Sequence, residues 1–553
     1  MVPGKSALSC LLPNGRRQLR LENKKQAVKH TLGGKIMTKR IFALLLALTL
    51  VVTLFAACGG NNESSTAGGD NSTSSKNDSS EASGEDSKTS TDDGDVPTIS
   101  LMVTCGATPA DTADIEAALS KITREKIGCN VEIITIEIGN ATQQMNLLLA
   151  GGDDTLDVFY AGIGTSFVNV ASQGQAMELD SLMEPYAEEM KKALGENVYE
   201  SGRINGKLYG VGRLLDQASV PCFTIRADIA EEFDYKNGDK INLEKLTELF
   251  QKVHDKYPDT PIIGPNNGAP NIGDSRVDSL GDGNKLGVLG NMGQDETVIN
   301  YYESEYYTEL VSYFKKWKEM GIYMPDLLNS TEAPVDFIPT GKCFGCFAGH
   351  FSAEMNGIWS SSNFGVDCAS LQIYEDTVAV TPGAYGCINP ATKNPEKAAG
   401  LLYLLSTDAD VENLLINGIE GQHYQVLEDG TATYVDGQDI TTVGWCLGYS
   451  WANQNSTLSI PFEYPADYFD QLLNANASAK QSKAFGCQFD LTGVSDAVSA
   501  CTNVVNQYAN PLAAGSVEDF DATLAKFQED LKAAGIDEII AARQEQLDEF
   551  LGK

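Results

Sequence analysis

The sequence has few basic residues, few histidines and no catalytic signature, and these absences narrow the possible functions. It contains 40 Lys and Arg against 76 Asp and Glu, and only four His among 553 residues. Nucleic-acid binding needs basic side chains to neutralise phosphates, so a formal net charge of −36 argues against it. No Gly-x-Ser-x-Gly elbow, His-Glu-x-x-His motif or P-loop is present, which disfavours hydrolase, zinc-protease and NTPase chemistry.

Cysteine occurs twelve times, but its spacing gives no metal site. Only Cys343 and Cys346 lie close together, whereas structural zinc commonly needs two such pairs or Cys combined with His. We therefore expect no catalytic residue, no cofactor and no metal. For the cysteines two alternatives stay open, namely buried thiols or one or two disulfides. Calcium binding also stays open for the Gly-rich stretch that holds Asp274, Asp278 and Asp282.

One apolar run stands out near the start of the chain, from Ile41 to Ala57. Its 17 residues are at or below the roughly 17–25 that a membrane-spanning helix needs. Lys39 and Arg40 precede the run, and small Ala residues end it directly before Cys58. A basic start, an apolar centre and a small-residue cleavage site predict a secretion signal.

The residues that end this run, Leu54-Phe55-Ala56-Ala57-Cys58, resemble the lipobox of bacterial lipoproteins. The resemblance implies that residues 37–57 are the signal peptide and that Cys58 carries the lipid, such as palmitate. Residues 1–36 precede the natural start of such a signal and are expected to be a misassigned upstream extension. Residues 58–97 are almost entirely small or polar, so they cannot bury enough apolar area to fold and are expected to form a disordered tether.

The body of the chain begins with alternating strand and helix patterns. Apolar or β-branched runs predict strands, and apolar residues at helical spacing predict helices, in the order strand 98–103, helix 111–127, strand 129–138, helix 142–150 and strand 156–160. This order predicts a parallel sheet with right-handed crossovers. Ligands of such sheets bind beyond the carboxyl ends of the strands, which makes residues 160–166 a first candidate wall.

Later motifs predict turns and helix boundaries. Asn205-Gly206 and Asp429-Gly430 each predict a tight hairpin turn. Asn394-Pro395 predicts the start of a helix that continues to Ser406, and residues 517–551 read as two amphipathic helices broken at Gly535.

Several of these motifs together carry a family resemblance over most of residues 98–551. They are Ile-Asn-Gly-Lys-Leu-Tyr-Gly-Val at 204–211, Asn-Pro-Glu-Lys-Ala at 394–398, Gly-Ile-Glu-Gly-Gln-His-Tyr at 418–424 and Leu-Lys-Ala-Ala-Gly-Ile-Asp at 531–537. In this order they resemble the solute-binding lipoproteins of bacterial ABC importers, namely extracellular solute-binding family 1 with the C-terminal domain of unknown function of one lipoprotein subfamily.

The resemblance implies an α/β fold of the type II periplasmic-binding-protein kind, with two lobes and a ligand cleft between them. The expected parts are lobe 1 over 98–220, lobe 2 over 221–376, a return to lobe 1 over 377–406, and mainly lobe 2 with the C-terminal helices over 407–553. The chain would cross between the lobes near 216–221, near 377–385 and again after Ser406.

The resemblance also implies a function, a location and partners. The expected function is capture of a carbohydrate, an oligosaccharide, at the extracellular face of the cell membrane, followed by delivery to the permease subunits of an ABC transporter. A monomer held to the membrane through Cys58 is expected, with no enzyme activity and no nucleic-acid partner. The open alternatives are the same fold binding a peptide or other small solute, and a secreted glycoside-acting enzyme or a sensor lipoprotein.

The candidate ligand residues lie in loops that the resemblance places beside the cleft. Sugar sites stack aromatic rings on apolar sugar faces and use carboxylates and Arg for the hydroxyl groups. The candidates chosen on that basis are Tyr160, Arg213, Asp216, Tyr385, Glu420, Tyr424, Trp445 and Trp451.

Overall fold

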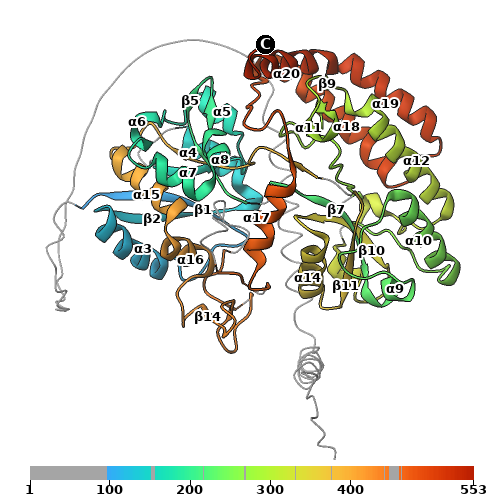
Figure 1. The fold of residues 1–553 in the computed structure, drawn as a ribbon, viewed down its shortest axis with the longest axis horizontal. Helices are drawn as coiled ribbons and strands as arrows, with labels where there is room; N and C mark the ends of the chain where they lie inside the picture. The colour runs from blue at the N-terminus through green and yellow to red at the C-terminus, as the bar shows by residue number, and fades with distance from the viewer. Residues whose placement is uncertain are drawn as a thin grey trace, which may run out of the picture. The chain divides into compact units, whose positions relative to one another are not determined.

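The fold is described by a computed structural model over residues 96–553, apart from 151–155, 216, 267–268, 331, 375–376, 441, 448–459 and 463 (Figure 1). The predicted signal peptide, the lipidation site at Cys58 and the tether as far as residue 95 lie outside the described residues. No helix in the described part of the chain is long and apolar enough to cross a bilayer.

Lobe 1 is built on a five-stranded sheet with the order β2-β1-β3-β13-β6. The strands are β1 (Thr98–Cys105), β2 (Asn130–Glu137), β3 (Val158–Ala161), β6 (Val211–Gly212) and β13 (Tyr385–Ile388). The first three are parallel, and α3 (Thr112–Lys126) and α4 (Ala141–Leu149) connect them. The predicted β-α-β-α-β arrangement is therefore confirmed. β13 returns antiparallel to β3 and closes the sheet with β6.

Further helices cover this sheet, and one hairpin projects from it. The helices are α5 (Phe167–Ser172), α6 (Asp180–Met183), α7 (Ala187–Leu194), α8 (Glu196–Glu200), α15 (Pro395–Thr407) and α16 (Ala409–Asn417). The hairpin joins β4 (Arg203–Ile204) to β5 (Lys207–Leu208). Asn205 and Gly206 form its turn with φ of 51° and 78°, as the Asn-Gly pair predicts, because a two-residue turn of this type needs positive φ at both positions.

Lobe 2 holds a three-stranded antiparallel sheet with the order β10-β7-β11, from β7 (Val220–Arg226), β10 (Gly345–His350) and β11 (Cys368–Gln372). The surrounding elements are α9 (Ala227–Glu232), α10 (Leu243–Lys256), β8 (Val288–Leu289), α11 (Gly290–Gly293), β9 (Val298–Ile299), α12 (Glu305–Met320), α13 (Pro334–Phe337), α14 (Ala353–Phe364), α18 (Ser495–Ala513), α19 (Phe520–Ala534) and α20 (Ile536–Phe550). The lobe core is aromatic: Phe250 lies edge-on to Phe223 at 4.7 Å and to Trp317 at 5.5 Å.

The C-terminal helices α19 and α20 meet at Gly535, which has a φ of 98°, so the predicted break is confirmed. Helix α18, with 19 residues, was not predicted and packs against both.

The acidic stretch at 274–282 is held by arginines rather than arranged as a cation site. Asp274 accepts a bond from Arg276 at 2.8 Å, Asp282 pairs with Arg543 at 3.0 Å, and Asp278 accepts from the Leu280 amide at 2.8 Å. No group of three or more His, Cys, Asp or Glu side chains in the described residues could hold a metal ion.

The ten cysteines of the described residues are all free thiols, and nine of them are buried. Of the two alternatives that the sequence left open, the structure has the buried thiols. Cys343 and Cys346 lie in the core of lobe 2, where burial raises the pKa of the Cys343 thiol to about 12.

The chain passes between the lobes at three places. The first passage leads from β6 into β7, the second contains β12 (Val378–Ala379), and the third contains β16 (Lys480–Gln481). β12 pairs with β16, and Ala218 bridges to Ala379, so the three passages lie side by side.

The third passage lies later in the chain than the sequence expectation of a crossing after Ser406, with residues 407–553 mainly in lobe 2. Helix α16 and Trp445 belong to the hydrophobic core of lobe 1, so the chain stays with that lobe as far as Leu447. The hairpin of β14 (Tyr424–Val426) and β15 (Ala432–Tyr434), with its predicted Asp429-Gly430 turn, lies in this added part. The chain crosses only after α17 (Tyr468–Ser478), because the apolar face of α16 needs the lobe 1 core.

Candidate functional site

The loop after β3 is held tightly at the carboxyl edge of the lobe 1 sheet. A Cβ at Gly162, where φ is 105°, would lie 2.0 Å from the Gly383 carbonyl oxygen, and one at Gly164 would lie 2.7 Å from the Ala141 backbone. Only glycine fits such close approaches. The loop is therefore wedged between the start of α4 and the second passage, and it carries the Thr165 hydroxyl, which is buried without a hydrogen-bond partner among the described residues.

Helix α17 bridges the two lobes, and Figure 1 shows it in orange between them. Tyr468 and Leu472 pack on Phe351 in lobe 2, and Leu473 packs against both that cluster and the core of lobe 1. Near the end of the helix, the Asn476 side-chain amide donates to the Leu215 carbonyl at 2.8 Å and accepts from the Gln217 amide at 2.9 Å. The helix is thus fixed to both lobes and to the first passage at once.

An aromatic cluster surrounds the start of α17; we define it as His350, Phe351, Tyr464, Tyr468 and Phe469. Tyr464 stacks on Tyr468 with ring centroids 4.4 Å apart, and Phe351 meets Tyr468 at 5.2 Å. Phe351 and Tyr468 are buried, while His350, Tyr464 and Phe469 are half-buried. His350, Tyr464 and Phe469 thus keep part of their surface exposed, and aromatic side chains are the kind of group on which the C–H face of a sugar stacks.

His350 contributes a neutral hydrogen-bond donor to the cluster. Its Nδ1 accepts a bond from the Phe351 amide at 2.9 Å, so the ring hydrogen lies on Nε2. Burial lowers the pKa of His350 to about 4, because a low-dielectric environment disfavours the charged imidazolium. At neutral pH the ring therefore carries no charge.

Three of the aromatic residues predicted as ligand contacts lie in the core of lobe 1 instead: Tyr160 is 1%, Tyr385 2% and Trp445 0% exposed. Their rings pack between the lobe 1 sheet and the helices that cover it. The Trp445 indole donates to the Leu415 carbonyl at 2.9 Å, and the Tyr385 hydroxyl donates to Ser201 at 3.3 Å. A side chain committed to packing in this way does not present a face to a ligand in this structure.

The remaining predicted residues divide between the rim of lobe 1 and undescribed positions. Glu420 is exposed, Tyr424 is 6% exposed in β14, and Arg213 is half-buried beside the second passage, where its amide donates to the Ala384 carbonyl at 3.3 Å. Asp216 and Trp451 lie outside the described residues.

The loop that carries Glu420 and Tyr424 is tied to the start of α3. The His423 ring, 1% exposed, bonds the Asp111 carboxylate at 3.1 Å, and Gln422 donates to Asp114 at 3.0 Å. Since α3 follows the loop after β1, these bonds bring the 418–424 motif to the same edge of the sheet as the carboxyl ends of the strands.

Sequence reasoning missed the aromatic cluster because it did not predict α17. A usable signal was present: residues 462–469 contain four aromatic residues, Phe462, Tyr464, Tyr468 and Phe469, in eight positions.

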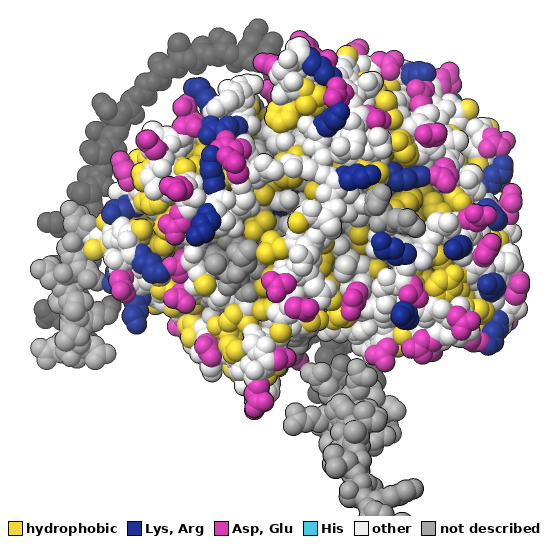
Figure 2. Space-filling model, viewed as in Figure 1, with side chains coloured by type: hydrophobic (Ala, Val, Ile, Leu, Met, Phe, Trp, Pro, Cys, Tyr) yellow, Lys and Arg dark blue, Asp and Glu magenta, His cyan; other side chains and the backbone are white. Residues whose placement is uncertain are grey.

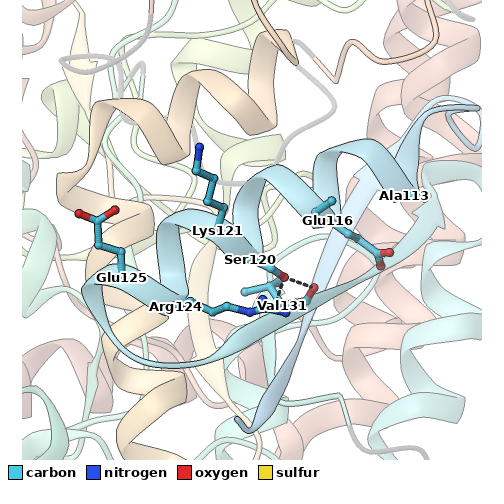
Figure 3. A pocket seen from close by; sticks show the side chains of 8 residues that line it. Ala113, Glu116, Ser120, Lys121, Arg124, Glu125 and Val131 are labelled. Carbon is cyan, nitrogen blue, oxygen red and sulfur yellow. Dashed lines mark hydrogen bonds between the residues drawn. The ribbon is translucent and has the colours of Figure 1, made fainter. Parts of the chain in front are cut away.

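Two hollows lie away from this cluster. The hollow of Figure 3 runs along the outer side of α3, and its lining comes from that helix and Val131 of β2 alone. There Ser120 is bonded to the Val131 backbone at 2.9 Å and 3.2 Å, and the surrounding charged side chains belong to one lobe. A second pocket, of about 490 Å³, lies between the β4–β5 hairpin, residues 485–488 and α20.

Comparison with known proteins supports the arrangement of lobes described above. A family model described as a domain of unknown function, DUF3502, matches residues 483–552, which follow β16 and contain the C-terminal helices α18, α19 and α20. A carbohydrate ABC transporter substrate-binding protein of Streptococcus pneumoniae serotype 4 is 24% identical over 481 residues, covering 84% of this chain and 93% of that protein.

Solved structures resemble the whole described body. The N-glycan transport solute-binding protein NgtS of Streptococcus pneumoniae matches with a TM-score of 0.70 and 21% identity, covering 83% of this chain and 99% of that one. The fold is that of a two-lobed solute-binding protein. An HMO-binding, ABC-transporter-associated solute-binding protein of Bifidobacterium longum infantis also matches, with a TM-score of 0.58 and 15% identity, covering 82% of this chain and 99% of that one. The resemblance and the fold class predicted from the sequence are thereby confirmed.

Proposed function

We propose that this chain is the solute-binding protein of an ABC importer, and that it captures an oligosaccharide between its lobes and delivers it to the permease. The observation that carries the proposal is the half-buried aromatic cluster at the start of α17, the helix that touches both lobes. A ligand that stacks there contacts the element on which lobe closure depends. The relatives add support, since NgtS has been solved with Man5GlcNAc and with Man1GlcNAc.

Closure would couple binding to recognition by the permease. A ligand shifts a hinge equilibrium only by the difference between its contacts in the open and the closed form. Short paired passages, here β12, β16 and Ala218, are where a hinge of this kind bends. Tyr464 and Phe469 would hold the ligand on the α17 side, with Arg213 and Glu420 at the rim of lobe 1. Asp216 and Trp451 stay in the proposed contact set.

The chain would act outside the cell as a tethered monomer. The lipobox-like residues before Cys58 support a diacylglycerol anchor on that thiol, and the polar stretch after it supports a flexible leash. Two measurements test the anchor. A lipoprotein-specific lipase should release the chain from the membrane, and the Cys58→Ala variant should not be retained there.

The test of function is a thermal-shift screen of the chain against oligosaccharides, uronates, peptides and calcium. A ligand at 100 times its Kd should stabilise the folded state by roughly 2.7 kcal/mol, which a melting curve resolves. We expect a shift with one class of oligosaccharide. A shift with peptides alone would mean that the ligand is a peptide and not a sugar. Turnover of a labelled glycan would show an enzyme instead of a binding protein.

A variant pair tests the aromatic cluster itself. Tyr464→Ala should weaken oligosaccharide affinity at least tenfold, about 1.4 kcal/mol, because the stacking face is lost. Tyr403→Ala is the matched control, since Tyr403 stacks on Tyr186 at 4.6 Å on the helices of lobe 1, in a geometry close to that of Tyr464 and Tyr468. Equal losses in both variants would contradict a role for the cluster in binding.

A further inference from the structure

The stretch between Lys397 and Lys480 contains no Lys or Arg at all. In the same stretch stand eleven Asp and Glu and ten aromatic residues. It comprises most of α15, α16, the β14–β15 hairpin and α17. Its first part packs on the core of lobe 1, and α17 then packs on lobe 2 at the aromatic cluster. On the face seen in Figure 2, the region of the hairpin at the lower left is hydrophobic and acidic, and the basic side chains lie elsewhere.

The arginines that could supply positive charge from neighbouring elements are engaged with carboxylates. Arg203 bonds Asp180 at 2.7 Å and also Glu200. Arg226, at the far end of β7, bonds Asp228 at 2.8 Å and the carbonyls of residues 338 and 339.

Arg276 is the most constrained of them. Its guanidinium lies between the rings of Tyr306 and Tyr374, at 5.2 Å and 4.8 Å, and bonds both Asp274 and Glu309. Arg213, which the proposed contact set places at the rim of lobe 1, is likewise not without a partner, and neither are Lys240 and Lys480. Lys483, which follows β16, pairs with Glu296 at 2.5 Å.

His350 adds no positive charge, because its ring is neutral at physiological pH with the hydrogen on Nε2. At the start of α17 the exposed charged side chains are Asp467, the N-cap residue, and Asp470 in the first turn, both acidic. A ligand at the cluster therefore meets aromatic faces, neutral donors and carboxylate acceptors.

We propose that the site between the lobes takes an uncharged oligosaccharide and rejects glycans that carry a carboxylate, sulfate or phosphate. The proposal rests on the proposed function and narrows its ligand class. The hydroxyl groups of a neutral glycan can donate to the carboxylates while its apolar faces stack on the rings. An anionic sugar would lose hydration without gaining a charge-assisted partner, and burying an unpaired charge is strongly unfavourable.

The experiment is isothermal titration of the chain with matched glycan pairs that differ only in a terminal charge, such as lacto-N-tetraose and its sialylated form, and a mannose/N-acetylglucosamine oligosaccharide with and without sialic acid. We expect the charged member of a bound pair to bind at least tenfold more weakly. The Kd of the neutral member should not change between 20 mM and 500 mM salt, because no ion pair contributes to it.

The charge is then tested directly with Asp467→Lys, a substitution next to Tyr468 that removes no capping bond, since the Asp467 side chain makes none. Because it replaces a carboxylate acceptor by a cation, it should lower the ratio of the sialylated-glycan Kd to the neutral-glycan Kd at least threefold, while Asp537→Lys on α20 should leave both affinities unchanged. Charged and neutral members binding within threefold of each other would overturn this inference and leave the proposed function standing. Absence of any glycan binding, with stabilisation by peptides, would overturn both.

Discussion

Arg543 shows how one side chain joins the C-terminal helices to the rest of lobe 2. It is 2% exposed, pairs with Asp282 at 3.0 Å and donates to the Leu280 carbonyl at 3.1 Å. Removing one partner of a buried ion pair leaves the other charge uncompensated.

Arg543→Met should therefore lower the free energy of unfolding by about 3 kcal/mol, measured by urea denaturation. Lys526→Met on α19 is the control, because its pairs with Glu529 and Asp530 lie at the surface, where water screens them, so the free energy of unfolding should change little. Similar losses in the two variants would show that the Arg543 pair is not the anchor described here.

His350 makes stability depend on pH in a defined window. Its pKa is lowered from 6.5 to about 4 in the folded chain, so below pH 6.5 the unfolded chain binds the proton more readily. Stability is then fully present above pH 6.5 and is lost as the pH falls towards 4.

His350→Gln should remove this part of the acid sensitivity, about 1–3 kcal/mol by pH 4. Unfolding free energies of the two proteins, measured from pH 8 to pH 4, should run parallel above pH 6.5 and converge or cross below it. Parallel curves over the whole range would contradict the assignment.

At the scale of elements, α17 acts as the connection between the lobes and the passages. Asn476→Ala deletes both of its bonds to the first passage, and we expect a loss of about 1 kcal/mol in stability with faster amide hydrogen exchange at residues 215–220. Asn474→Ala, an exposed position on the same helix, should change neither quantity. Equal effects of the two variants would mean that α17 stabilises only through its packing.

Elements with a strong local signal could be predicted from the sequence, and elements defined by packing could not. The β-α-β-α-β order followed from apolar periodicity, the β4–β5 turn from Asn205-Gly206, and the last helix break from Gly535. Helix α17 has a mixed pattern, because its faces serve two different lobes, so no single apolar stripe marks it.

The same distinction holds for the candidate site. Aromatic residues beside glycines were predicted to face a ligand, yet Trp445 and Tyr385 fill the lobe 1 core, because a sheet between helix layers needs large side chains on both faces. Burial of a ring depends on which elements pack over it, and those partners are far away in sequence: Trp445 bonds Leu415, and Phe351 meets Tyr468. Local composition does not carry that information.

At the scale of the whole molecule, two lobes, three paired passages and a bridging helix form the architecture on which the proposed ligand capture depends. The α/β architecture and two-lobed fold were predictable from the motif order, while the place of the third passage required the structure. The sequence shows that residues 398–479 contain no Lys or Arg, but only the structure shows that α16 in this stretch packs on lobe 1 and α17 on lobe 2.

Isothermal titration calorimetry of the chain with neutral oligosaccharides, run beside Tyr464→Ala, tests the central claim most directly. The account predicts saturable binding of one glycan per chain, weakened at least tenfold by Tyr464→Ala and unaffected by Tyr403→Ala. Absence of heat with every oligosaccharide, or binding that Tyr464→Ala leaves unchanged, would contradict capture of a sugar at the aromatic cluster between the lobes.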